Sequence, residues 1–336
     1  MRAGLMSSSF KWSHVANNLP ALSWSGQKRI LFLTILQPQM IEEVASTTKR
    51  RVLRLLSVVN VHTLIFVALP LILAACYNFT TIDVPSAFRT IALGINNAGY
   101  VVGSFDDVNG THGFVRDTGG NFTTIDFPNA SSTEAHGIND AGEVIGNFGD
   151  GTRFRGFVRD ITGSFTVIEF PGISGIGFAF GINNPGQLVG KFLDAAGTHG
   201  FIRQSDGNLL TIDVPGSSTA AALGINNAGQ VVGYFDVGTG FRGFLRNTYG
   251  NLTIIEVPGA LYTEPFGINN NGEVVGLFIG SRFRGFLRDA KDSFTIINVP
   301  AASYTEVHGI NDTGLIVGSF DDATGTHGFI AVPASP

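Results

Sequence analysis

The sequence predicts an all-β protein, a six-bladed β-propeller of four-stranded blades that its N-terminal strand closes. Three observations lead to this prediction: a triplet that recurs at a nearly constant spacing, four short strand patterns in each repeat, and one isolated strand pattern before the first repeat. An open β-solenoid is the alternative that the same repeats allow.

The repeat is marked by the triplet Gly-Ile-Asn. Its glycine stands at positions 94, 137, 181, 224, 267 and 309, so successive copies lie 43, 44, 43, 43 and 42 residues apart. A period of about 40 to 50 residues is typical of propeller blades built from four strands. The spacing therefore predicts six copies of one blade.

Four short runs with strand character make up each repeat. In the second repeat they cover residues 134–139, 143–148, 156–159 and 165–170. Asn139-Asp140-Ala141-Gly142 separates the first two runs, and Asn and Gly favour a tight hairpin turn because both tolerate positive φ. The fourth run of each complete repeat ends in Pro, which cannot donate to a strand ladder and so favours an edge or a strand end.

The two ends of the repeat region are offset by one strand. The last repeat stops after its third run, at Gly328-Phe329-Ile330, whereas an isolated fourth run, residues 79–85, precedes the first triplet. This offset predicts that the N-terminal strand completes the last blade and closes the ring. An open solenoid would instead need capping repeats and would leave long strand edges unpaired.

Composition divides the chain at Cys76 into an N-terminal extension, residues 1–76, and a repeat domain, residues 77–336. The extension holds 8 Lys and Arg against 2 Asp and Glu, whereas the domain holds 13 against 24 and lacks Met, Trp and Cys. The missing cysteines exclude a disulfide framework and a thiol nucleophile from the domain. The excess of acids argues against nucleic acid as a partner. We expect a monomer.

The N-terminal extension has the pattern of an export signal. Lys49, Arg50, Arg51 and Arg54 precede an apolar run at residues 61–75, which is short for a membrane-spanning helix. Leu73-Ala74-Ala75-Cys76 resembles a bacterial lipobox and predicts a lipid on Cys76. Secretion after ordinary signal cleavage and an uncleaved anchor helix remain alternatives. We expect an exported protein, on the cell surface or outer membrane or secreted, that contacts membrane only through this segment, with translation starting at Met40.

The repeats resemble the HAF family of probable extracellular repeats. Gly-Ile-Asn-Asn-x-Gly-x-Val-Val-Gly, as at residues 224–233, carries the resemblance, together with Thr-His-Gly-Phe in the third run. Three repeats have His-Gly-Phe where the family's motif has Ala in the middle, and three have Arg-Gly-Phe. The resemblance implies an exported β-rich protein, and it supplies no catalytic residue.

Residues that break the repeat symmetry are the candidates for function, because a residue found in every blade is explained by what every blade needs. The recurring Asn of the triplet is accordingly interpreted as a turn residue, and the recurring Phe of the third run as packing between blades. Just before the triplet, Glu134, Glu264 and Glu306 stand where other repeats have Ile91, Phe178 and Ala221. His136 and His308 occupy a slot that is Leu or Phe in four repeats, so a buried core His is the plainer interpretation.

From these positions we expect a binding surface, and its candidate residues are Phe88, Arg89, Glu134, His136, Tyr262, Glu264, Tyr304, Glu306 and His308. Glu and His two residues apart on a strand share a face, which suits a metal or an acid–base pair. Asp106, Asp107, Asp321 and Asp322 are weak candidates for Ca²⁺, with solvated surface acids as the alternative. No cofactor is otherwise expected.

No catalytic motif is visible in the sequence. The favoured hypothesis is a non-enzymatic exported propeller that binds a cell-envelope protein or a small polar ligand through its variable loops. The alternative is a propeller-type hydrolase or lyase with a metal or a carboxylate pair in the central channel.

Overall fold

Strands account for all the regular structure in the described part of the computed structural model. The structure describes residues 77–169 and 177–334, where it has 24 strands and no helix. All of these residues belong to one unit of the chain, Leu69–Pro336. Nothing helical in these two ranges has the length and apolar character needed to cross a bilayer. The predicted export signal, the lipid on Cys76 and the start at Met40 lie outside the described residues.

The strands pair antiparallel in groups of four, and each group corresponds to one repeat of the sequence. The first group contains β2 (Arg89–Ile95), β3 (Val101–Asp107), β4 (Gly110–Arg116) and β5 (Phe122–Ile125). The second contains β6 (Ser132–Ile138), β7 (Val144–Gly149), β8 (Phe154–Arg159) and β9 (Phe165–Val167). The third contains β10 (Gly177–Ile182), β11 (Leu188–Leu193), β12 (Thr198–Arg203) and β13 (Leu209–Ile212).

The remaining groups follow the same order. The fourth contains β14 (Ala220–Ile225), β15 (Val231–Asp236), β16 (Phe241–Arg246) and β17 (Leu252–Ile255). The fifth contains β18 (Tyr262–Ile268), β19 (Val274–Ile279), β20 (Phe283–Arg288) and β21 (Phe294–Ile297). The last contains β22 (Tyr304–Ile310), β23 (Ile316–Asp321) and β24 (Thr326–Pro333), and its fourth strand is β1 (Tyr77–Ile82) from the other end of the domain.

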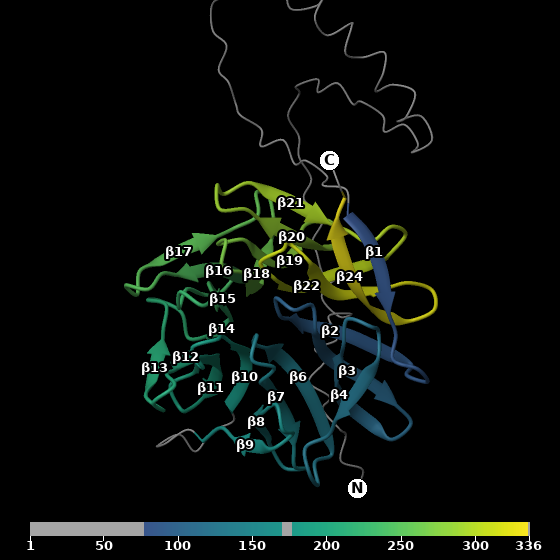
Figure 1. Cartoon of the computed structure of the whole chain (residues 1–336). Helices are drawn as coiled ribbons and strands as arrows, with labels where there is room; N and C mark the ends of the chain where they lie inside the picture. The colour runs from purple at the N-terminus through teal and green to yellow at the C-terminus, as the bar shows by residue number, and fades with distance from the viewer. Residues whose placement is uncertain (1–76, 170–176, 335–336) are drawn as a thin grey trace, which may run out of the picture. The chain divides into compact units, whose positions relative to one another are not determined.

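β1 pairs antiparallel with β24, in a register that runs from Tyr77 opposite Pro333 to Ile82 opposite Gly328. Figure 1 shows this pair of strands, one from each end of the described chain, side by side. The Phe79 ring of β1 meets the Phe329 ring of β24 edge-on at 5.5 Å between centroids. The N-terminal strand is therefore held by the last repeat through both backbone pairing and side-chain packing.

The sheets are arranged around a common centre, with the first strand of each group innermost (Figure 1). Each first strand contacts the first strand of the next group, and β22 contacts β2. Between some groups a single parallel residue pair links neighbouring sheets, as at Arg89–Thr326 and Thr111–Ser132. Residues on the inward face of the first strands are consequently brought together from all the repeats.

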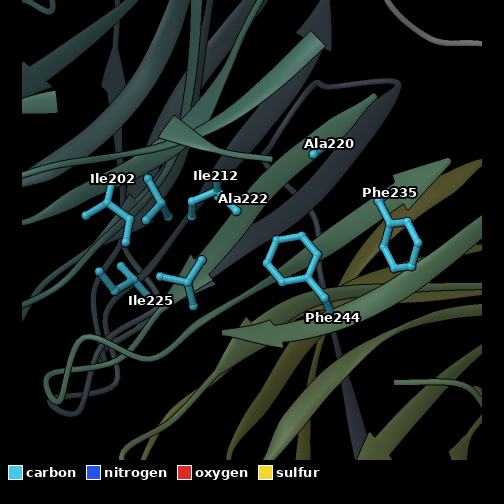
Figure 2. Close-up of a cluster of buried hydrophobic side chains, with 9 residues drawn as sticks. Ile202, Ile212, Ala220, Ala222, Ile225, Phe235 and Phe244 are labelled. Atoms are coloured by element: carbon cyan, nitrogen blue, oxygen red, sulfur yellow. The ribbon is translucent and has the colours of Figure 1, made fainter. Parts of the chain in front are cut away.

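The hydrophobic core lies between neighbouring sheets. Figure 2 shows one such cluster, in which Ile202 and Ile212 of the third group pack with Ile225, Phe235 and Phe244 of the fourth. The recurring Phe of the third strands, Phe244 here, is fully buried in every group, as the sequence predicts for blade packing. β1 also enters this pattern, because Ile82 belongs to a cluster shared by the first and last groups.

Each first strand carries a β-bulge one residue before the glycine of the triplet. In β18 the register shifts between Pro265 and Gly267, so Phe266 has no partner of its own on β19. The opposite glycine on the second strand makes this approach possible: a Cβ on Gly276 would lie 2.2 Å from the carbonyl oxygen of Glu264. The recurring glycine of the second strand thus marks a close approach of two backbones, and the bulge changes the direction of the residue next to it.

The predicted strand bounds in the second repeat differ from the observed ones by at most three residues. The first strand of the second repeat begins at Ser132, because its backbone pairs there with Thr111 of the preceding group. The third strand begins at Phe154, two residues earlier than predicted, since it continues its antiparallel pairing with β7 to Gly149. The fourth strand ends at Val167.

Candidate functional site

Alternate residues of the first strands face the common centre, while the residues between them are buried in the cores. In β22, Thr305 and Val307 are fully buried, whereas Tyr304, Glu306 and His308 are half-buried on the other face. The same alternation in β6 turns Glu134 and His136 inward. His136 and His308 stand at the bulge position of their strands. The inner face thus collects the residues that break the repeat symmetry.

Second strands add two side chains to the inner face. Lys191 of β11 pairs with Phe178 of β10, and Tyr234 of β15 pairs with Ala221 of β14, so each shares a face with its inward-facing partner. We call the resulting group the axial cluster. It consists of Arg89, Glu134, His136, Lys191, Tyr234, Glu264, Tyr304, Glu306 and His308.

The Glu306 carboxylate accepts a hydrogen bond from Tyr304 but none from His308. The Tyr304 hydroxyl donates to Glu306 Oε2 at 2.7 Å. Burial raises the pKa of Tyr304 well above its ordinary value, and the negative charge of Glu306 adds to this, so the phenol stays protonated. His308 Nε2 lies 3.8 Å from the same carboxylate oxygen, which is too far for a hydrogen bond.

The His308 ring is buried as a neutral base. Its Nε2 atom is inaccessible to water and has no hydrogen-bond partner. Burial lowers the pKa of His308, the charge of Glu306 opposes this, and His136 and Arg89 lower it further. His308 is buried, as expected for a core His at this slot, but its Nε2 atom has no hydrogen-bond partner.

Glu264 is the carboxyl group of the cluster whose pKa is raised furthest from its ordinary value. Burial is the main cause that raises the pKa of Glu264 to about 7, the carboxylate of Glu306 raises it further, and Lys191 opposes them. The Lys191 ammonium donates to the Tyr234 hydroxyl at 3.5 Å and lies 5.6 Å from the Phe178 ring. Burial lowers the pKa of Lys191, against the effect of Glu264. The charges of three repeats therefore interact across this part of the cluster.

Glu134 and His136 form an ion pair within β6. Glu134 Oε2 lies 3.2 Å from His136 Nε2. Burial alone would raise the pKa of Glu134, but the hydrogen bond with His136 and the charges of His136 and Arg89 outweigh it and hold that pKa below its ordinary value. Arg89 itself is fixed by Asp106 at 3.1 Å. On this side of the cluster, Glu134 therefore has a hydrogen-bond partner within its own strand.

Two of the residues predicted from the sequence lie outside the axial cluster. Phe88 is 66% exposed in the segment that leads into β2. Tyr262 begins β18 and places its ring 6.3 Å from the Phe241 ring of the fourth group. Conversely, sequence reasoning missed Lys191 and Tyr234. Lys191 stands where other second strands have Ser104, Asn147, Leu277 or Ser319, and that break in symmetry was the available signal.

The asparagines of the triplet link the groups at the other end of the first strands. Each Oδ1 accepts the backbone N–H four residues later, as in Asn226 with Gln230, which is the predicted turn role. Each Nδ2 also donates to the carbonyl of the same Asn in the next group, over 3.0 to 3.4 Å. Asn311 donates in this way to Asn96, so the bonds run through all the repeats. This second role was missed by the sequence analysis.

A second circle of hydrogen bonds lies beside the first. The residue after each asparagine accepts, through its side-chain oxygen, the backbone N–H of its counterpart in the preceding group, over 2.8 to 2.9 Å. The two circles surround a polar hollow of about 70 Å³. These side chains form their hydrogen bonds with one another. We therefore interpret the asparagine end of the first strands as structural.

The four candidate Ca²⁺ ligands bind groups within or beside their own hairpins. Asp106 binds Arg89 and Thr111, and Asp107 accepts the N–H of Asn109. Asp321 binds Thr326, and Asp322 binds Thr324. In residues 77–169 and 177–334, no three His, Cys, Asp or Glu side chains are grouped so as to hold a metal ion.

Comparisons with known proteins bear on the fold. No protein-family model and no curated protein sequence matches the chain. TolB from Acinetobacter baumannii is 12% identical over 73% of this chain and 64% of that structure, with a TM-score of 0.52. A structural genomics protein of unknown function from Bacteroides thetaiotaomicron is 12% identical over 76% of both chains, with a TM-score of 0.51. The chain is a β-propeller. At these identities the likeness of the propeller to its neighbours concerns architecture alone.

Proposed function

We propose that the strand groups are the blades of a six-bladed propeller and that β1 closes the ring. Three observations support this: β1 pairs with β24, β22 contacts β2, and Asn311 donates to Asn96 as each asparagine does to the next. A closed ring fixes the distances across its centre, which a binding site there requires.

We further propose that the protein is a binding module rather than an enzyme and that the axial cluster takes a small polar ligand. One observation carries this proposal: ionisable groups occupy positions that the fold fills elsewhere with Ile91 or Ala221, and one of them, His308, has a buried Nε2 atom without a hydrogen-bond partner. Burying unpartnered polar groups costs about 1 to 3 kcal/mol each, so a purely structural axis favours apolar residues. A ligand that pairs with these groups would offset the cost.

The test is ligand screening against matched variants. A panel of small polar metabolites is added to each protein, and binding is measured as the rise of its melting temperature. The proteins are the wild type, the double variant Glu264→Ala with Glu306→Ala, and the control Glu256→Ala, at the residue that follows β17. We expect ligands that stabilise the wild type and the control but not the double variant. Equal stabilisation of all three would remove the axial cluster as the site.

A second candidate function is hydrolysis or elimination catalysed by the carboxyl pair. The observation that favours it is the pKa of Glu264, which burial raises to about 7 beside a second carboxyl group, since a carboxylic acid that keeps its proton near neutral pH can serve as a general acid. The test is turnover by the purified protein on ester, lactone and glycoside panels, with Glu264→Gln as the comparison. Activity that disappears in this variant supports catalysis, and activity that persists in it contradicts this role.

We propose export to the cell envelope as the setting, with a cell-envelope protein as the other class of partner. The basic residues before the apolar run at residues 61–75 and the position of Cys76 support this. Mass spectrometry of the mature protein tests it: a diacylglycerol-modified Cys76 at the N-terminus indicates lipidation, an unmodified N-terminus nearby indicates secretion, and an intact Met1 contradicts both.

A further inference from the structure

The axial cluster has more acceptors than donors around Glu264. None of the described residues donates a hydrogen bond to the Glu264 carboxylate, and the nearby Lys191 donates to Tyr234 instead. The groups that face Glu264 are Glu306 and Tyr304 of β22, Lys191 of β11 and Tyr234 of β15. The Tyr304 hydroxyl is already used by Glu306. Glu264 is therefore a carboxyl group without a protein donor.

His308 points to the same conclusion from the other side of Glu306. Its Nε2 is buried without a partner, 3.8 Å from Glu306 Oε2. A neutral imidazole accepts a hydrogen bond at its unprotonated nitrogen and donates one at the other, and a carboxylate accepts several. A group that carries several N–H donors would satisfy the carboxylates of Glu264 and Glu306, the second of which lies beside the unpartnered His308.

Aromatic side chains lie beside His308 and Lys191 in the axial cluster. Phe266, the bulge residue two positions after Glu264, places its ring 5.2 Å from the His308 ring. Phe178 and Phe180 of β10 lie parallel, with 6.2 Å between their centroids. In such surroundings the effective dielectric is lower than in water, so a positive charge between two carboxylates is bound more strongly.

We propose that the axial cluster binds the ammonium group of a small organic amine between Glu264 and Glu306. The inference rests on the proposed binding function and names the chemical class of its ligand. The amine enters in its charged form, RNH₃⁺, and donates to the two carboxylates. The proton that Glu264 holds when the ligand is absent passes to the buffer, so the charge of the pair is balanced by the amine instead of by that proton.

The experiment compares propylammonium with propan-1-ol on the full chain, because the two probes have the same length and differ in charge. Binding is followed by the ¹³C shift of the Glu264 carboxyl carbon, and proton release by calorimetry in buffers of different ionisation enthalpy. We expect propylammonium to bind, propan-1-ol not to bind, and binding to be about 30-fold weaker at about pH 5.5 than at about pH 8, because the ligand competes with a proton that leaves near pH 7.

Variants separate this site from surface attraction. Glu264→Gln and Glu306→Gln keep the shape of the side chains and should each weaken propylammonium binding by about tenfold or more. Glu256→Gln, on the outer part of the fourth group, should not weaken it. Far-ultraviolet circular dichroism and the melting temperature establish that each variant is folded.

The outcomes divide as follows. Binding that is lost in both axial variants but kept in Glu256→Gln supports the inference. Equal binding of propan-1-ol, equal binding to all variants, binding of Mg²⁺ or Ca²⁺ in place of the amine, or no propylammonium shift up to its highest soluble concentration would each overturn it. The proposed function survives that result if a neutral or anionic metabolite still needs Glu264 and Glu306, and it fails as well if no ligand of any charge needs them.

Discussion

At the scale of single residues, the inner face of the propeller places acids where their protonation is coupled to folding. The pKa of Glu264 is raised to about 7 from an ordinary value of 4.5, mainly by burial and then by Glu306. Between about pH 4.5 and 7, Glu264 is therefore protonated in the folded protein and ionised in the unfolded chain. The stabilisation is complete below about pH 4.5 and is lost as the pH rises through about 7.

Glu264→Gln removes this dependence. The neutral amide imitates the protonated acid, so at about pH 8 we expect the variant to be more stable than the wild type by about 1 to 2 kcal/mol, with little difference at about pH 4.5. Urea unfolding at a series of pH values measures it. A variant that is less stable than the wild type at pH 8 would show that the charge of Glu264 is instead favourable in the folded protein.

The histidines of the third strands respond to pH in a different way from Glu264. His199 Nδ1 lies 2.6 Å from Asp213 and its Nε2 lies 3.1 Å from Asp194. The hydrogen bond with Asp213 is the main cause that raises the pKa of His199. A base with a raised pKa stabilises the folded state fully below about pH 6.5, and this is lost as the pH rises through the folded-state pKa.

His199→Gln should therefore cost stability at about pH 6 and almost none at about pH 9. The expected loss at the lower pH is up to about 1 kcal/mol, because the partner aspartates are largely exposed. Equilibrium unfolding at the two pH values gives the comparison. A loss that is equal at both would mean that packing of the ring on Phe192, not its charge, is what matters.

At the scale of elements, the first strand of each blade has two structural roles. Its bulge aims the residue before the glycine at the centre, and its terminal asparagine ties the blade to the next one. The positions of strands and turns could be predicted from the sequence because Asn, Gly and Pro determine local backbone conformation. The amide contacts between blades could not, because they join residues about 43 positions apart and depend on how neighbouring sheets pack.

Asn226→Ala tests the contribution of one such asparagine. Asn226 accepts the N–H of Gln230 and donates to the Gln230 side chain and to the carbonyl of Asn269, all within the protein interior. The substitution leaves buried groups unpartnered, and we expect it to lower the free energy of unfolding by about 2 to 4 kcal/mol. The neighbouring Asn227→Ala, which removes one exposed contact with Asn184, is the control and should cost under about 1 kcal/mol. Equal losses in the two variants would contradict the role assigned to Asn226.

At the scale of the whole molecule, the last repeat lacks a fourth strand of its own, and the N-terminal strand β1 takes that place. β1 covers the edge of β24, and Ile82 is buried in the core between the first and last groups. Without β1 the last sheet would present an unpaired strand edge. The pairing of β1 with β24 therefore stabilises the last sheet, and under the proposed closure of the ring it also stabilises the arrangement of residues around the centre.

Deletion of residues 77–83 from the full chain should accordingly lower stability by about 5 kcal/mol or more, since it exposes several buried apolar side chains and an edge strand. Size-exclusion chromatography and thermal unfolding measure the effect. A synthetic peptide with the sequence of residues 77–85 should restore part of the lost stability by pairing with β24 in trans. Unchanged unfolding after the deletion would contradict closure.

How much of the site could be predicted also depends on scale. Broken symmetry singled out Glu134, Glu264 and Glu306 without any structure, because a repeat protein shows which positions the fold leaves open. Lys191 was missed because the face that a second strand turns toward the centre depends on the bulge and on its pairing with Phe178.

The central claim is that side chains from separate repeats meet at the centre of a closed ring. The most direct test is the pKa of Glu264, measured from its ¹³C carboxyl shift in the wild type, in Glu306→Gln and in Lys191→Met. The structure predicts a pKa of about 7 that falls when Glu306 loses its charge and rises when Lys191 loses its own. An ordinary pKa that neither substitution moves would show that these three residues do not meet.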